Sequence, residues 1–286
     1  MKTKLTLLLL GASTILFVYG ATHPVVDFIV YWAAAHNFVQ HHNPYSIVEI
    51  FQIQRAQGWT GSIPIMMLAP PWVLPLIEPL GYSRSYFAAW LLSAFLLISA
   101  TALASRMLMD LYFGSLEISE ISHPKVYRYL FAFTFYPVLL SLKMTQMGVL
   151  LLLAMAGFAY FQNQKRPLLA ALFLSATILK PHLFILIWIV VLLKRQWTCV
   201  AVTAGVIALL SGLVLISDHQ IFREYVQLMT GDYPRIALAG ILGGVRSALE
   251  PHDTYWLQFI PPIVGIVWFV FYWRKHRFDW KNACRA

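Results

Sequence analysis

The 286-residue chain has little charge and almost no cysteine. Only 12% of its residues are charged, against about 25% in a typical soluble domain, and this scarcity excludes a water-soluble fold. The two cysteines, Cys199 and Cys284, are too few for a disulfide framework or a four-cysteine metal site. Hydrophobic residues make up 59% of the chain, and several uncharged runs approach the ~20 residues that a helix needs to cross a bilayer. The composition therefore predicts a multi-span membrane protein.

The charge that is present is mostly positive. Lys and Arg number 21 against 12 Asp and Glu, which gives a formal charge of +9. In a soluble protein this balance could indicate a nucleic-acid partner. Here the basic residues gather at the ends of apolar runs, as at Lys165-Arg166, Lys194-Arg195 and after Arg274. Basic residues at such positions mark the cytoplasmic side of a membrane, so we expect no nucleic-acid partner.

Nine uncharged or nearly uncharged runs are candidate spans: 5–20, 63–80, 86–105, 129–142, 147–161, 167–179, 183–193, 197–217 and 255–273. Two runs separate each pair of successive basic loops in the second half, as the positive-inside rule requires. Five runs lie between Lys4 and Lys165, an odd number, so one of them should not cross. We assign this to 129–142, a short run with Pro137 inside it, as a re-entrant stub buried in protein. Eight crossings remain.

This topology predicts one integral membrane domain, 1–286, with a basic cytoplasmic tail at 274–286. It places four segments on the outer face: a first loop at 21–62, 106–146, the turn Lys180 to His182, and a second loop at 218–254. The runs on either side of Lys180 are short for spans, so we expect them to lean on protein neighbours. The first run, after Lys2 and Lys4, is either an uncleaved first helix, the simpler interpretation, or a signal peptide.

The first outer loop has a helical pattern. Apolar and aromatic residues recur at the three-and-four spacing of one helix face, at Phe28, Tyr31, Trp32, Ala35, Phe38 and Val39. This predicts an amphipathic helix that lies at the headgroup level and ends at Asn43-Pro44. Ser46 and Glu49 have the spacing of a capping box, which predicts a second short helix from Ser46.

Asp27 stands at the start of this loop, next to the predicted first span. One interpretation is an N-cap, a role that aspartate often fills. The other is functional, because a carboxylate held among Phe28, Tyr31 and Trp32 at a membrane surface is partly desolvated and so a better proton acceptor.

Several short motifs resemble glycosyltransferase family 87. They are Asp27-Phe28, Tyr31-Trp32, Ala34-Ala35, Asn43-Pro44-Tyr45, Pro70-Pro71 and Lys180-Pro181, and the likeness covers most of the first 200 residues. The resemblance implies an all-α polytopic membrane protein, a GT-C-like bundle of about eight transmembrane helices with interfacial helices in the first outer loop. It also implies a mannosyltransferase that uses polyprenyl-phosphate-mannose, with Asp27 as the catalytic base.

The chain departs from the family pattern in two places. Thr145-Gln146 stands where the family commonly has Gly-Gln. The carboxyl-terminal half, which usually shapes the acceptor site, is short, and this leaves open whether it is reduced here.

Other residues are candidates for substrate binding. Lys180 is the first choice for the donor phosphate, because a lysine between apolar runs usually lines a cavity; the alternative is a lysine that snorkels to the headgroups. Arg246, after Gly243-Gly244, and Arg235 are further phosphate candidates, or ordinary loop charges. Gln146 could bond sugar hydroxyls or satisfy the adjacent stub. Tyr31 and Trp32 could stack on sugars or belong to an aromatic belt. Asn43 and Tyr45 are the last two candidates for substrate binding.

We expect no metal and no cofactor. Four histidines, His23, His36, His41 and His42, fall in the first outer loop, but they lack a regular ligand interval. We therefore assign them a surface or headgroup role.

The sequence thus predicts a glycosyltransferase in a bacterial inner membrane, its active site on the outer face. It would transfer a hexose, mannose being the first choice, from a polyprenyl-phosphate carrier to a glycan or glycolipid acceptor, with inversion. Its partners would be this donor, the acceptor and membrane lipids. Two alternatives stay open: a catalytically inactive relative that acts as a membrane assembly factor, and a transporter or flippase for lipid-linked sugars.

Overall fold

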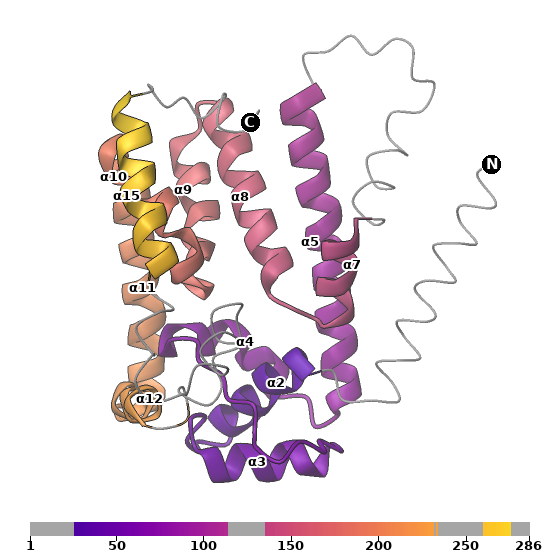
Figure 1. Cartoon of the computed structure of the whole chain (residues 1–286). Helices are drawn as coiled ribbons and strands as arrows, with labels where there is room; N and C mark the ends of the chain where they lie inside the picture. The colour runs from indigo at the N-terminus through magenta and orange to yellow at the C-terminus, as the bar shows by residue number, and fades with distance from the viewer. Residues whose placement is uncertain (1–25, 114–134, 232, 234–259, 276–286) are drawn as a thin grey trace, which may run out of the picture.

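The computed structural model describes residues 26–113, 135–231, 233 and 260–275, and every regular element within them is a helix (Figure 1). The all-α prediction is confirmed for this part of the chain. The elements are α2 (Val26–Val39), α3 (Ile47–Ala56), η1 (Pro71–Val73), α4 (Leu74–Gly81), α5 (Tyr86–Phe113), α7 (Tyr136–Lys143), α8 (Gly148–Asn163), α9 (Pro167–Ser175), η2 (Ala176–Leu179), η3 (Pro181–Phe184), α10 (Ile185–Leu193), α11 (Trp197–Ser217), α12 (Ile221–Thr230) and α15 (Ile260–Lys275).

The helices form two parts (Figure 1). Helices α5, α8, α9, α11 and α10 pack each against the next in what we call the bundle. At one end of the bundle α2, α3, α4 and α12 lie across it, and we call these four helices with the chain from 57 to 73 the outer layer. The largest cluster of buried side chains joins the two parts, because it combines outer-layer residues with Met147, Leu179 and Val214 of the bundle.

Two helices in the described residues are long and apolar enough to cross a membrane, Tyr86–Leu111 and Trp197–Ser217. Shorter apolar helices cover Gly148–Asn163, Pro167–Leu179, Pro181–Leu193 and Ile263–Tyr272. The count of eight crossings therefore stays a prediction, and its first run, 5–20, lies outside the described residues.

Helices α5 and α8 run parallel, and this corrects part of the predicted topology. Leu97 and Ala100 pack in one cluster with Val149, and Ala104 and Met107 pack in another with Ala156, so the two helices advance together. The carboxyl end of α5 therefore lies at the same end of the bundle as Lys165-Arg166, after α8 (Figure 1). The predicted topology put residues 106–113 and Lys165-Arg166 on opposite sides, and this part of it is wrong.

The predicted crossing at 63–80 is also wrong. Residues 63–70 form no helix, and α4 has only 8 residues, or ~12 Å of length. Side chains from other elements take up the backbone groups that a helix would pair. Gln54 Nε2 donates to Ile65 O at 2.7 Å and Gln54 Oε1 accepts from Ile65 N at 3.0 Å, and Tyr233 Oη accepts from Met66 N at 2.8 Å and donates to Pro64 O at 3.1 Å.

The run 129–142, which we assigned as the run that does not cross, is only partly described. Its described part lies in the short helix α7, with 8 residues, and residues 129–134 lie outside the described residues. That assignment therefore stays a prediction.

The two short runs beside Lys180 behave differently from each other. Helix α9 is packed between α8 and α11, with Ala170, Ala171 and Leu174 fully buried. This confirms that it leans on protein. Helix α10 buries Val190 and Val191 but exposes Leu186, Leu192 and Leu193, so one of its faces is open to lipid.

The two predicted helices of the first outer loop are present, but the first is not amphipathic. Helix α2 buries residues on all sides, Ile29, Ala33 and Phe38 among them, because α4 packs closely on it. A Cβ on Gly81 would lie 2.3 Å from Ala35 O. Ser46 caps α3 by accepting from Glu49 N at 3.4 Å, as predicted. The Glu49 carboxylate, however, accepts from Asn37 Nδ2 at 2.9 Å.

Candidate active site

Asp27 lies in the first turn of α2, and its Oδ2 accepts a hydrogen bond from Gln146 Nε2. The two residues are 119 positions apart in the chain. Both were predicted as site residues, Asp27 as base and Gln146 as a sugar ligand, and the structure brings them into contact. Both side chains are partly exposed, so the carboxylate keeps access to a substrate.

Gln146 is held in place by a tight turn between α7 and α8. Gln146 N donates to Ser141 O at 2.8 Å and Thr145 N donates to Leu142 O at 3.1 Å, which is the pattern of a Schellman motif with Thr145 at its left-handed position. Thr145 has φ +52°, a conformation that glycine adopts freely and that costs a β-branched residue about 1–3 kcal/mol. Glycine would adopt the same conformation without this cost.

A buried hydrogen bond compensates the strain at Thr145. Trp90 Nε1 donates to Thr145 Oγ1 at 3.1 Å, and the two residues are only 5% and 4% exposed. Trp90 belongs to α5, so the turn that carries Gln146 is tied to the longest helix of the bundle.

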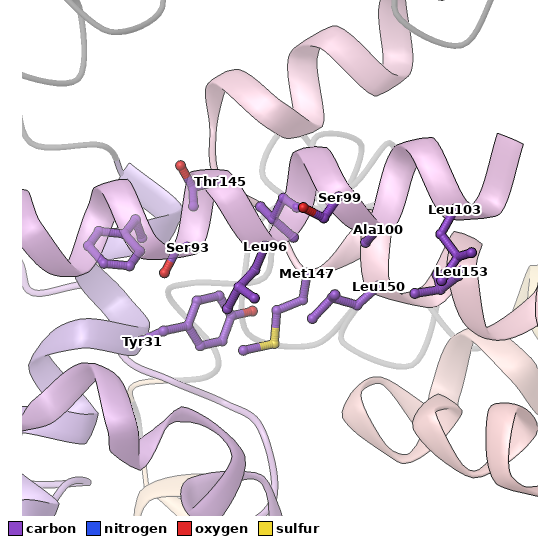
Figure 2. Close-up of a pocket in the computed structure, with 12 residues that line it drawn as sticks. Tyr31, Ser93, Leu96, Ser99, Ala100, Leu103, Thr145, Met147, Leu150 and Leu153 are labelled. Carbon is purple, nitrogen blue, oxygen red and sulfur yellow. The ribbon is translucent and has the colours of Figure 1, made fainter. Parts of the chain in front are cut away.

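An apolar cavity of about 380 Å³ is lined by side chains of α5 and by residues near Asp27 and Gln146 in sequence. Helix α5 supplies Ser93, Leu96, Leu97, Ser99, Ala100 and Leu103, while the rest of its lining is Phe28, Tyr31, Thr145, Met147, Leu150 and Leu153. Figure 2 shows Tyr31 at one end of the cavity and Leu103 with Leu153 at the other. Leu96 and Leu103 are exposed on the surface of α5, a candidate membrane-spanning helix. If α5 crosses the membrane, this side of the cavity faces lipid.

Asp27 and Gln146 are not among the residues that line the cavity, but their neighbours in sequence are. Phe28 and Tyr31, which follow it on α2, line the cavity, and so do Thr145 and Met147, which flank Gln146. Burial and the nearby Asp27 carboxylate raise the pKa of Tyr31 to about 12. At neutral pH the Tyr31 hydroxyl is therefore protonated, so Tyr31 can donate a hydrogen bond to a ligand but cannot act as a base.

Lys180 lies at the break between η2 and η3, partly exposed. Trp72 of η1 donates from Nε1 to Ile178 O at 3.2 Å, which fixes this break against the outer layer. Leu179, just before Lys180, and Met147, just after Gln146, belong to the same buried cluster. The Lys180 turn and the Gln146 turn thus surround one core at the outer end of the bundle.

Three predicted binding residues, Trp32, Asn43 and Tyr45, contact other parts of the protein in the structure. Trp32 is 2% exposed and stacks on His36 at 5.0 Å between ring centroids. Asn43 Oδ1 accepts from Tyr45 N at 2.7 Å, as in an Asx turn. Tyr45 is 3% exposed and donates to Ala69 O at 3.1 Å. These contacts favour a structural role, so we do not carry the three residues into the proposed site.

The remaining predictions are only partly covered. Arg235, Arg246 and His23 lie outside the described residues. His41 and His42 are exposed and His36 is partly so, and in the described part of the chain no three His, Cys, Asp or Glu residues are grouped so that they could hold a metal ion.

Sequence reasoning missed the contribution of α5. Ser93, Ser99 and Ala100 are small residues in an apolar span, a signal that backbones or ligands approach closely. Their side chains leave the room that the cavity occupies. The sequence contains this signal, but it does not reveal that α8 packs beside these residues and closes the cavity.

The comparisons with known proteins give one result. A family model, glycosyltransferase family 87, matches residues 68–285. The match covers about three quarters of the chain and includes the carboxyl-terminal half, so that half is part of the family region and not foreign to it. It begins after Asp27, so the family match does not itself assign that residue. No curated protein and no solved structure matches the chain.

Proposed function

Because the chain belongs to glycosyltransferase family 87 and is thus a membrane glycosyltransferase, we propose that it uses a polyprenyl-phosphate sugar as donor. The sugar is a hexose, with mannose as the first candidate, and the acceptor is a glycan or glycolipid at the outer face of the plasma membrane. Asp27 is the general base, and transfer inverts the anomeric configuration.

One observation carries this proposal: an apolar cavity along α5 is lined by residues next to Asp27 and Gln146 in sequence, and the Gln146 amide donates to the Asp27 carboxylate. A prenyl chain is wholly apolar, so a slot of aliphatic side chains along 93–103 of α5 suits it. The cavity runs over roughly ten residues of α5, or ~15 Å, which accommodates the first part of a long lipid. The phosphate and sugar would then lie at the level of Asp27.

The chemistry needs a base and a group that stabilises the leaving phosphate. Asp27 takes the proton from the acceptor hydroxyl, and the acceptor oxygen forms its bond to the anomeric carbon from the face opposite the phosphate. The bond from the anomeric carbon to the phosphate oxygen breaks, and polyprenyl phosphate leaves with the bonding electrons. Asp27 returns its proton to water.

Lys180 is our candidate for binding the phosphate, since negative charge grows there as the bond breaks. Its support is its place at a helix break beside the outer layer. Arg235 and Arg246 stay candidates for the same role. A Lys180→Gln variant should lose transfer mainly through kcat, because the charge matters most in the transition state.

The test is transfer of labelled mannose from a synthetic polyprenyl-phosphate donor by the purified protein in lipid vesicles. We expect wild-type protein to transfer label and Asp27→Asn to lose it by about 10²–10⁴-fold at unchanged protein level. Asp218→Asn is the matched control, because Asp218 is another carboxylate at the same end and accepts from Gln220 N at 2.8 Å. It should keep its activity.

Two results would count against the proposal. Full transfer by Asp27→Asn removes that residue as the base. If the wild type transfers no sugar from any carrier-linked donor, including glucose and galactose, the assembly-factor interpretation gains, and movement of donor lipid across the vesicle without transfer would favour a flippase.

A further inference from the structure

We infer that the turn at Thr145, locked by Trp90, is a positioning device that holds the Gln146 amide against the Asp27 carboxylate. This inference rests on the proposed role of Asp27 as base. It assigns Gln146 and Trp90 as positioning residues, which act on the acceptor only through Asp27.

The first argument is the unusual character of the Thr145 turn. Four described residues other than glycine have positive φ: His41, Thr145, Lys165 and Arg195. Each of the four follows a helix and stands just before a residue whose N–H reaches back five positions. His41, Lys165 and Arg195 are unbranched at Cβ and exposed, whereas Thr145 is β-branched and 4% exposed. Backbone strain that persists at a buried position points to a function for the position.

The second argument is that the strained turn contacts both Trp90 of α5 and Asp27 of α2. Trp90 fixes the hydroxyl of Thr145 from α5, and the next residue, Gln146, donates to Asp27 Oδ2. Two hydrogen bonds to adjacent residues of the α7–α8 turn thus link this turn to α5 and to α2. With Oδ2 held by Gln146, we assign Oδ1 as the oxygen that takes the acceptor proton.

The geometry also separates this role from direct sugar binding by Gln146. The amide nitrogen of Gln146 is engaged with Asp27, so a sugar ligand would have to compete with a carboxylate for it. A positioning residue that is lost lowers kcat, because the base is misaligned, and leaves donor binding nearly intact. A sugar ligand that is lost raises KM for the donor.

Kinetics of three variants test the device. We expect Gln146→Met, which keeps the length but cannot donate, to lower kcat by about 10–100-fold with less than a threefold change in donor KM. Trp90→Phe should lower kcat by about tenfold. Trp188→Phe is the matched control, because Trp188 Nε1 donates to Thr177 Oγ1 at the same 3.1 Å away from Asp27, and it should keep wild-type kcat. A rise in KM without a fall in kcat for Gln146→Met would overturn the positioning role.

Substitutions at Thr145 separate positioning from stability. Thr145→Gly relieves the backbone strain but removes the acceptor for Trp90, so the midpoint of thermal unfolding should hold or rise while kcat falls about tenfold. Thr145→Ser keeps the hydroxyl and should restore kcat to within about twofold of wild type. If Thr145→Gly is both more stable and fully active, the turn is only a structural feature and the inference is wrong.

A measurement without activity keeps the inference testable if the proposed function fails. The melting temperatures of Asp27→Ala, Gln146→Met and the double variant in detergent form a double-mutant cycle. If the two side chains share a hydrogen bond, the drop in melting temperature of the double variant should be smaller than the sum of the drops of the two single variants. Additive losses would show that the pair is not coupled, and the device would then be excluded even for an active enzyme.

Discussion

The outer layer and the bundle hold their shapes in different ways. In the outer layer, buried polar side chains bind backbone groups far away in sequence: Gln54 to Ile65, Tyr233 to Pro64 and Met66, and Tyr45 to Ala69. In the bundle, small and apolar side chains fill the contacts, such as Ala170 and Ala171 against Phe158.

The difference suits the two tasks that the site requires. Directional hydrogen bonds fix the arrangement of the outer layer, and one of them, from Asn37 to Glu49, ties α2, which carries Asp27, to α3. Apolar packing has no direction, so the bundle can leave a cavity between α5 and α8. A rigid polar layer over an accommodating apolar slot is what a base above a lipid tail needs.

If polar contacts hold the outer layer together, the largest loss of stability should come from substituting Gln54, which is fully buried. Gln54→Leu leaves the N–H and C=O of Ile65 without partners, and each unmet group costs about 1–3 kcal/mol. We expect a loss of about 4 kcal/mol in thermal or denaturant unfolding in detergent. Gln52→Leu, at an exposed position of the same helix, should change stability little. Equal stability of the two variants would refute the role of polar contacts in the outer layer.

A pair of glycines compares the stiffness of the two parts. A Cβ on Gly81 would lie 2.3 Å from the backbone oxygen of Ala35, whereas one on Gly157 would meet the ring of Phe173. The backbone of α2 cannot yield, but Phe173 is partly exposed and can shift toward lipid. We expect Gly81→Ala to cost about 3 kcal/mol and Gly157→Ala about 1 kcal/mol, measured by unfolding. The reverse order would mean that the bundle is the stiffer part.

Filling the cavity should have a moderate effect on donor use. Ser99 lines the cavity at an exposed position of α5. Ser99→Phe would occupy part of the slot and raise the donor KM by about tenfold, or ~1.4 kcal/mol. Ile98→Phe, on the same helix but outside the cavity lining, is the control and should leave KM unchanged. A donor KM unaffected by Ser99→Phe would indicate that the lipid binds elsewhere.

The smallest effect concerns Glu224 of α12. Burial, and then the nearby Asp218 and Glu49 carboxylates, raise the pKa of Glu224 above its ordinary value of 4.5, with Arg223 opposing them. The folded protein therefore holds this proton more tightly than the unfolded chain. Its contribution to stability is complete below pH 4.5 and is lost as pH rises through the raised pKa. Melting temperatures across this window should decline less for Glu224→Gln than for wild type, and parallel curves would contradict the assignment.

The sequence predicted the features that depend on local patterns. The spacing of apolar residues located α2 and α3, and the Ser46 hydroxyl caps α3 as its position indicates. The length of the uncharged runs found α5 and α11. Asp27 and Gln146 were each singled out, one by position and the other by resemblance.

What the sequence could not give depends on contacts between distant residues. The run 63–80 is apolar enough for a span, but Tyr233, about 170 positions away, helps to hold its first part, 63–70, in a non-helical form. The spacing of α2 suggested an interfacial helix, because nothing local reveals that α4 covers its other face. The contact between Asp27 and Gln146, and the parallel arrangement of α5 and α8, depend likewise on tertiary packing.

Photolabelling tests the central claim most directly, namely that the carrier lipid lies in the slot that ends at Asp27. The probe is a polyprenyl-phosphate-mannose analogue with a photoreactive group in its first prenyl units, applied to the protein in vesicles. The account predicts labelled peptides from 93–103 of α5 and 145–153 of α8 and its preceding turn, with less labelling in Ser99→Phe and in the presence of unlabelled donor. Labelling confined to α9, α10 or α11, unchanged by Ser99→Phe, would contradict it.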